Sequence, residues 1–207
     1  MKTAVTKCYI LGHKDFGEKD KLIFMYSKDL GKIKVIAKGA RRITSRFMGH
    51  LETLNHCTAS LYFGPKNIIL TEITLHSSFA KKTDLNKLTS ALQIAEVTDK
   101  ILFENQTIDN LENLIQKTIE QINKSEKTQL ITAAYILKLL DLAGLIPNFK
   151  ETPLKLGEKY QKFFNFVQKN SIEEIDKIKI TSEESLKINR FLKEILLREL
   201  NAELKYI

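Results

Sequence analysis

The chain has 207 residues, of which 43% are hydrophobic and 28% charged, and its formal net charge is +8. These proportions are typical of a globular protein with one large or two modest domains, and no apolar stretch reaches the roughly 18 residues that a membrane span needs. The N-terminus also lacks the apolar segment of a signal peptide. We therefore expect a cytoplasmic protein that does not contact a membrane.

The positive charge is concentrated near the N-terminus. Residues 1–78 hold 13 Lys and Arg against 6 Asp and Glu, whereas residues 79–207 hold 20 against 19. All four histidines also lie in the first part, but they lack the spacing of metal ligands. This asymmetry is typical of a chain whose first part binds nucleic acid or an acidic membrane surface, and of the two we expect nucleic acid.

The first part has the pattern of short β-strands. Apolar runs rich in β-branched and aromatic residues are separated by turn signals, and they predict strands at about 5–13, 21–27, 32–39, 53–63 and 68–76. Cys8 and Cys57 lie within two of these runs, where we expect them to behave as small core hydrophobes. A closed five-stranded barrel hides the strand edges, and the OB-fold is the commonest barrel of that strand count.

The remainder has helical spacing of its apolar residues. Helices are predicted at about 85–102, 108–122 and 126–143, the last ended by Gly144, and Thr181 with Glu184 forms a capping box that begins a long C-terminal helix. The third helix is apolar nearly all round, so we expect it to be central. The predicted fold class is α+β, with an OB-fold domain at residues 1–78 and an all-helical domain at residues 79–207.

A dense basic run extends from Lys28, before the third predicted strand, through that strand to Arg46 in the loop that follows it. It contains one acidic residue, Asp29, and seven positive ones: Lys28, Lys32, Lys34, Lys38, Arg41, Arg42 and Arg46. A solvated surface would explain it, but strand alternation places Lys32, Lys34 and Lys38 on one face and the arginines on the loop that follows, which favours a track for phosphates. Tyr26 and Phe47 are candidates either for stacking on bases or for the core.

Catalytic motifs are lacking by comparison. Asp15, Glu18 and Asp20 could form an acid–base pair or a metal site, but they alternate with lysines as in a self-neutralised surface turn. The sequence has no nucleophile elbow and no glycine-rich phosphate loop. We therefore expect a binding protein without enzymatic activity.

The segment "DFGEKDKLIFMYSKDLGKIKVIAKGARRITSRFMGHLETL" resembles the N-terminal signature of the bacterial RecO recombination and repair proteins. The positions that carry the resemblance are Gly17, Glu18, Asp20, Gly31, Gly39–Arg42, Ser45, Arg46 and Leu51. The later "LLDLAGLIPNF", residues 139–149, is similar to the family's core helix and its exit.

This resemblance implies an OB-fold followed by a helical domain in a mediator of DNA recombination. Such a mediator binds single- and double-stranded DNA, anneals complementary strands, and helps RecA to load, with RecR and the single-stranded DNA-binding protein (SSB) as partners. Lys38, Arg41, Arg42 and Arg46 match the family's DNA-facing basic element.

The chain also departs from the family pattern. Many members carry four zinc-binding cysteines where residues 150–180 have none, so we expect no zinc or other cofactor; the apolar residues expected to hold this segment instead are Leu154, Leu156, Phe163, Phe164 and Phe166. Some members also have arginines on the central helix, placed to meet the acidic tail of SSB; around that point this chain has Ala133, Ala134 and Tyr135. The docking place of that tail stays open, with Lys124, Lys127 and Lys138 as alternatives.

Two other functions compete with this interpretation. A protein-interaction adaptor would use the basic surface to dock an acidic protein tail and would have little affinity for DNA. An RNA-binding OB-fold protein would share the electrostatics and differ only in its substrate.

Overall fold

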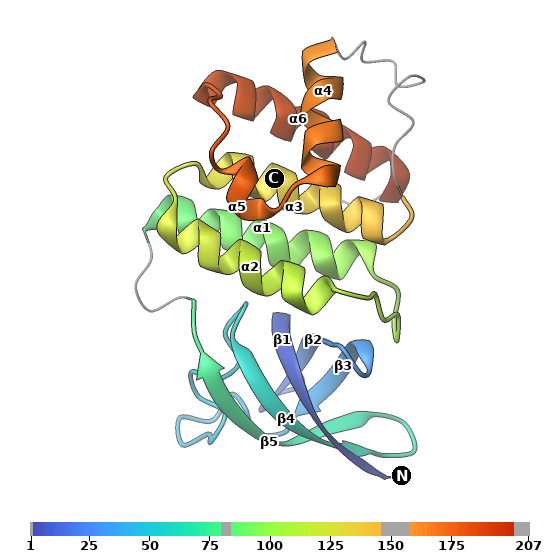
Figure 1. The fold of residues 1–207 in the computed structure, drawn as a ribbon. Helices are drawn as coiled ribbons and strands as arrows, with labels where there is room; N and C mark the ends of the chain where they lie inside the picture. The colour runs from blue at the N-terminus through green and yellow to red at the C-terminus, as the bar shows by residue number, and fades with distance from the viewer. Residues whose placement is uncertain (1, 80–83, 146–157, 201–207) are drawn as a thin grey trace. The chain divides into compact units, whose positions relative to one another are not determined.

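Figure 1 shows the computed structural model of the chain, which describes residues 2–79, 84–145 and 158–200. The chain divides into two units, one made of residues 1–83 with 102–112 and the other of residues 84–101 with 113–207. Within the described residues, no helix is both long enough and apolar enough to cross a membrane.

The first unit is a closed barrel of five strands in the order β1-β2-β3-β5-β4. All neighbouring strands are antiparallel except β3 and β5, which run parallel over the pairs Val35–Ile68 and Ile36–Ile69. This topology confirms the predicted OB-fold and the α+β class. The strands are β1 (Thr3–Phe16), β2 (Asp20–Ser27), β3 (Gly31–Ala37), β4 (His56–Phe63) and β5 (Ile68–Ser77).

The barrel core follows from the alternation of side chains along the strands. Ile23 and Met25 of β2 are fully buried inside, whereas Phe24 between them points to the outer face and is half-buried. Cys8 and Cys57 are register partners on β1 and β4; both are free and buried in the same core. The prediction that they are core hydrophobes is confirmed.

The segment between α1 (Leu85–Ile101) and α2 (Leu111–Lys124) belongs to the barrel unit, which the sequence analysis did not foresee when it assigned residues 79–207 to one helical domain. Glu104 forms an isolated parallel bridge with Lys32 of β3. The Lys32 N–H donates to the Gln106 carbonyl at 3.3 Å, and the Lys32 carbonyl accepts from the Asn105 N–H at 2.7 Å. The segment therefore satisfies backbone groups in the part of β3 that does not pair with β5.

The second unit is helical and is organised around α3 (Thr128–Leu142), which is buried on nearly all sides and contacts α1, α4, α5 and α6. This confirms the predicted central helix. The other helices are α1 (Leu85–Ile101), α2 (Leu111–Lys124), α4 (Glu158–Lys169), α5 (Ile172–Ile175) and α6 (Ser182–Leu200), of which α4 and α5 were not predicted.

Two predicted helix boundaries, the end of α3 at Gly144 and the capping box at the start of α6, are also confirmed. Gly144 has φ +71° and donates its N–H to the Asp141 carbonyl, while the Leu145 N–H reaches the Leu140 carbonyl, which is the Schellman arrangement. At the start of α6, the Thr181 N–H donates to Glu184 Oε2 at 3.0 Å and the Glu184 N–H donates to Thr181 Oγ1 at 3.2 Å.

The apolar residues expected to replace the zinc module have different outcomes. Phe163 and Phe164 of α4 are buried, and Phe164 stacks on Phe191 of α6 with ring centroids 5.8 Å apart. Phe166 is 38% exposed, so it contributes less to the core than expected. Leu154 and Leu156 lie outside the described residues.

Candidate nucleic-acid interface

The basic loop, residues 38–55 between β3 and β4, is anchored to the barrel by apolar side chains. Phe47, Leu51 and Leu54 are at most 4% exposed, and their burial attaches the loop to the barrel. The Asn55 side-chain amide, fully buried, donates to the Gly49 and His50 carbonyls at 3.0 Å each. Because these contacts fix the base of the loop, its charged residues are displayed from a defined backbone.

A clasp joins the basic loop to the turn between β1 and β2. Arg41 donates from Nη1 to the Gly17 carbonyl at 2.9 Å, and its Nη2 lies 3.2 Å from Asp15 Oδ2. Asp20 Oδ1 accepts the Gly39 N–H at 2.8 Å. Asp15 and Asp20, two of the three acidic residues that the sequence indicated as self-neutralised, therefore position the basic loop, and Arg41 has a structural role.

Besides Arg41, the exposed cations of the loop are Lys38, Arg42 and Arg46. In the part of the chain that the structure describes, no carboxylate pairs with any of them. The Arg46 guanidinium lies 5.2 Å from the centroid of the Phe47 ring, which orients it without neutralising its charge. These three side chains have the exposure and the unpaired charge that phosphate binding requires.

The predicted lysine face of β3 is interrupted. Lys28, in the turn before the strand, is exposed, and Lys34 is exposed but forms an ion pair with Glu104 at 2.9 Å. Lys32 is only 9% exposed, and its Nζ donates to the Leu102 carbonyl at 3.0 Å. The expectation of a continuous positive track along this strand is wrong at Lys32, because residues 102–112 lie against that end of the strand.

Both aromatic residues that the sequence offered as base-stacking candidates belong to the interior. Tyr26 and Phe47 are only 1% and 3% exposed, so they are core residues and not residues that stack on bases. The aromatic rings on the outer barrel surface near the basic loop are those of Phe16, which is 45% exposed, and Phe24. The signal that could have found Phe24 is its place between the two core residues Ile23 and Met25.

The histidines of the barrel do not gather into a metal site; among the described residues no group of three or more potential ligands was found. His56 stacks on Tyr9 with centroids 4.7 Å apart, and its ring centroid lies 5.4 Å from that of His76. Burial, followed by the proximity of His76, lowers the pKa of His56 below its ordinary value, although Glu112 opposes the shift. These surroundings favour the neutral form of the His56 imidazole.

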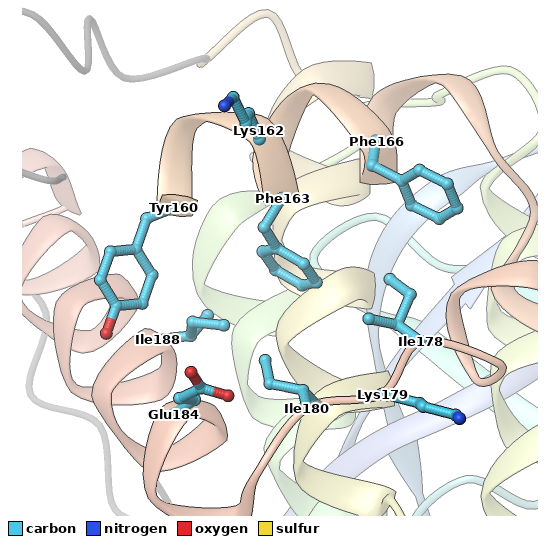
Figure 2. Close-up of a pocket in the computed structure, with 9 residues that line it drawn as sticks. All are labelled: Tyr160, Lys162, Phe163, Phe166, Ile178, Lys179, Ile180, Glu184 and Ile188. Atoms are coloured by element: carbon cyan, nitrogen blue, oxygen red, sulfur yellow. The ribbon is translucent and has the colours of Figure 1, made fainter. Parts of the chain in front are cut away.

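A separate cavity lies in the helical unit between α4, the segment before α6, and α6 (Figure 2). Its volume is about 340 Å³, and it is lined by Tyr160, Lys162, Phe163, Phe166, Ile178, Lys179, Ile180, Glu184 and Ile188. Its carboxylate, Glu184, already accepts the Thr181 N–H in the capping box. The cavity is thus an apolar surface with lysines near its rim and does not assemble a catalytic set.

The lysines considered for the acidic tail of SSB differ in their surroundings. Lys127 Nζ donates to the carbonyls of Asp176 at 2.6 Å and Ile178 at 3.1 Å, so it holds the segment that borders the cavity. Burial lowers the pKa of Lys138, with Asp141 opposing the shift. Lys124 is exposed at the end of α2. The three residues that replace the family's arginines, Ala133, Ala134 and Tyr135, are fully buried in α3.

Two family models match the chain and together span most of it. Residues 1–79 match "Recombination protein O N terminal", and residues 82–154 match "Recombination protein O C terminal". Among curated proteins, the DNA repair protein RecO of Thermoanaerobacter sp. (strain X514) is 30% identical over 169 residues, which is 80% of this chain and 67% of that protein. The chain belongs to the RecO family.

Other relatives have the same description. The DNA repair protein RecO of Roseiflexus sp. (strain RS-1) is 31% identical over 70% of this chain, and that of Alkaliphilus metalliredigens is 28% identical over 69%. These alignments cover 52% and 59% of the relatives. The chain therefore spans between half and two thirds of the length of the RecO proteins that it matches. The relatives are DNA repair proteins by their printed names, and the family resemblance stated from the sequence is confirmed.

Proposed function

We propose that this RecO-family chain is a non-enzymatic DNA-binding mediator of recombination, with the basic loop as its phosphate-binding element. The observation that carries the proposal is the set of three exposed, unpaired cations, Lys38, Arg42 and Arg46, on a loop whose base is fixed in the barrel core. Lys28 adds a further exposed cation at the opposite end of β3.

The mechanism that we propose is electrostatic. Arginine and lysine side chains bind backbone phosphates without reading bases, so the base edges of a bound single strand stay free to pair with a second strand. Arg41 acts indirectly, because its contacts with Asp15 and Gly17 hold the loop in place. Annealing of complementary strands requires this combination of a held backbone and free base edges.

The protein partners follow from the family and are part of the proposal. We expect RecR and SSB to bind the chain, and RecA to benefit indirectly when the chain assists its loading on single strands. We also predict that the chain binds DNA without zinc. Metal analysis of the purified protein tests whether zinc is present.

A protein-interaction adaptor is the second candidate, because the loop also presents apolar side chains. Ile43 is 90% exposed and Met48 is 60% exposed, beside the loop cations. Such side chains are suited to docking on a protein as well as to contact with nucleic acid. The adaptor would bind its protein partner after nuclease treatment while binding DNA negligibly.

The test is a charge-matched pair of triple variants. Lys38→Ala with Arg42→Ala and Arg46→Ala should weaken binding of a labelled single-stranded oligonucleotide at least tenfold without lowering the melting temperature. The control removes three exposed lysines elsewhere on the barrel, Lys2, Lys7 and Lys66. Because both triple variants lose the same charge, equal losses would reject the basic loop as a specific site. RNA of the same length, added as competitor, separates an RNA-binding protein from a DNA-binding one.

A further inference from the structure

The outer face of β1, β2 and β3 carries an aromatic ring beside an open space. Gly12 of β1, Phe24 of β2 and Lys34 of β3 are register partners and form one row across the sheet. The neighbouring row contains Lys14 and Leu22. These rows lie on the outside of the barrel, because the residues on either side of Phe24 along β2 are buried in its interior.

The Phe24 ring is half-buried and is accompanied by a cation. Lys14 Nζ lies 5.7 Å from the ring centroid, within the range of a cation–π contact. At Gly12, directly opposite Phe24, a Cβ atom would have no heavy atom within 4 Å. The surface beside the ring is therefore unfilled, and a side chain at position 12 would project into it.

We propose that Phe24 is a stacking platform for a base of single-stranded DNA, with Gly12 leaving room for the base and Lys14 placed for the adjacent phosphate. This inference rests on the proposed function and specifies where a base lies. An aromatic face accepts any base, so the contact adds affinity without sequence preference. A duplex keeps its bases stacked inside and gains nothing from the ring.

The charges around the platform favour a polyanion. Glu104 forms an ion pair with Lys34, which neutralises its charge. Asp20, on the same outer face but nearer the basic loop, accepts the Gly39 N–H. Lys14 makes no ion pair with any residue that the structure describes. The carboxylates of Glu104 and Asp20 therefore already have partners, whereas the charge of Lys14 is available for phosphate.

The platform is also continuous with the basic loop. Phe16, 45% exposed, lies on the same outer face of β1, two positions beyond Lys14. Its neighbours Asp15 and Gly17 form the clasp with Arg41. A strand whose phosphates are held by the basic loop can therefore pass over Phe16 and Lys14 and reach Phe24.

The experiment compares an oligothymidylate with an abasic strand of the same length, which has the same phosphates and no bases. The wild-type chain should bind the thymidylate about tenfold more tightly, the change expected from one stacked base. Phe24→Leu should lose this preference and leave duplex affinity unchanged, whereas Phe24→Tyr should keep it. Gly12→Ile, which fills the open space without altering the ring, should lose it as Phe24→Leu does.

The control is Tyr62→Leu, which removes an aromatic ring, 38% exposed, from β4 of the same barrel. It should keep the wild-type preference. If Phe24→Leu and Gly12→Ile both keep the preference, or if the wild-type chain binds both strands equally, the stacking platform is overturned while DNA binding stands. If the wild-type chain binds neither strand, the proposed function itself is overturned.

Discussion

The hydroxyl group of Tyr26 hydrogen-bonds both backbone polar groups of Ile108, 82 positions further along the chain. It donates to the Ile108 carbonyl at 3.0 Å and accepts the Ile108 N–H at 3.2 Å. Tyr26 is 1% exposed, so both backbone groups are satisfied away from water. This pair fixes the segment 102–112 to the barrel, and the same segment removes Lys32 from the surface.

Tyr26→Phe should destabilise the chain by about 2 kcal/mol, because it leaves the buried Ile108 N–H without its partner and the Ile108 carbonyl with only the Leu111 N–H, at 3.3 Å. The measurement is the free energy of unfolding in urea. Tyr62→Phe, which removes a hydroxyl from an exposed ring on β4, serves as the control and should change stability little. Equal effects of the two substitutions would show that the Ile108 contact adds nothing to stability.

Gly31→Ala should also disturb the segment 102–112, because Gly31 lies against its backbone. Gly31 has φ +69°, and an added Cβ would lie 2.5 Å from the Gln106 carbonyl carbon and oxygen. Gly17 has φ +62° with no atom within 4 Å of such a Cβ, so Gly17→Ala reports the backbone strain alone, roughly 1–2 kcal/mol. Gly31→Ala should cost more than this control in urea unfolding. A loss no greater than that of Gly17→Ala would mean that the segment moves away without cost.

Stability should fall as the pH decreases below about 6.5, the ordinary pKa of histidine. The pKa of His56 is lowered in the folded chain by burial and by His76, and burial also lowers that of His13. The unfolded chain therefore binds more protons in the interval between the ordinary and the lowered pKa values, which favours unfolding there. Thermal melts across this interval measure the decline. His56→Gln should make it shallower, and an unchanged slope in this variant would contradict the assignment.

The barrel and the central helix were predictable because their signals are local. Strand alternation, turn residues and the all-apolar character of α3 depend on neighbouring positions, and the structure has them where the sequence indicated. The exposed loop cations were likewise found from charge alone. The burial of Lys32 was not predictable, because it depends on a segment about 70 positions away whose own sequence has no strand pattern. Phe24 was overlooked because Tyr26 lies on the same face of β2 with a similar ring, and the segment 102–112, which covers Tyr26, decides which of the two stays accessible.

The measurement that tests the central claim most directly is anisotropy of a labelled single-stranded oligonucleotide, titrated with the chain at several salt concentrations. Four exposed cations, Lys28, Lys38, Arg42 and Arg46, predict a slope of log affinity against log salt of roughly −3, at about 0.7 for each phosphate contact. The variant that lacks the three loop cations should have a slope of roughly −1. Absence of binding at low salt, or the same slope in both proteins, would contradict the claim that the basic loop binds phosphates.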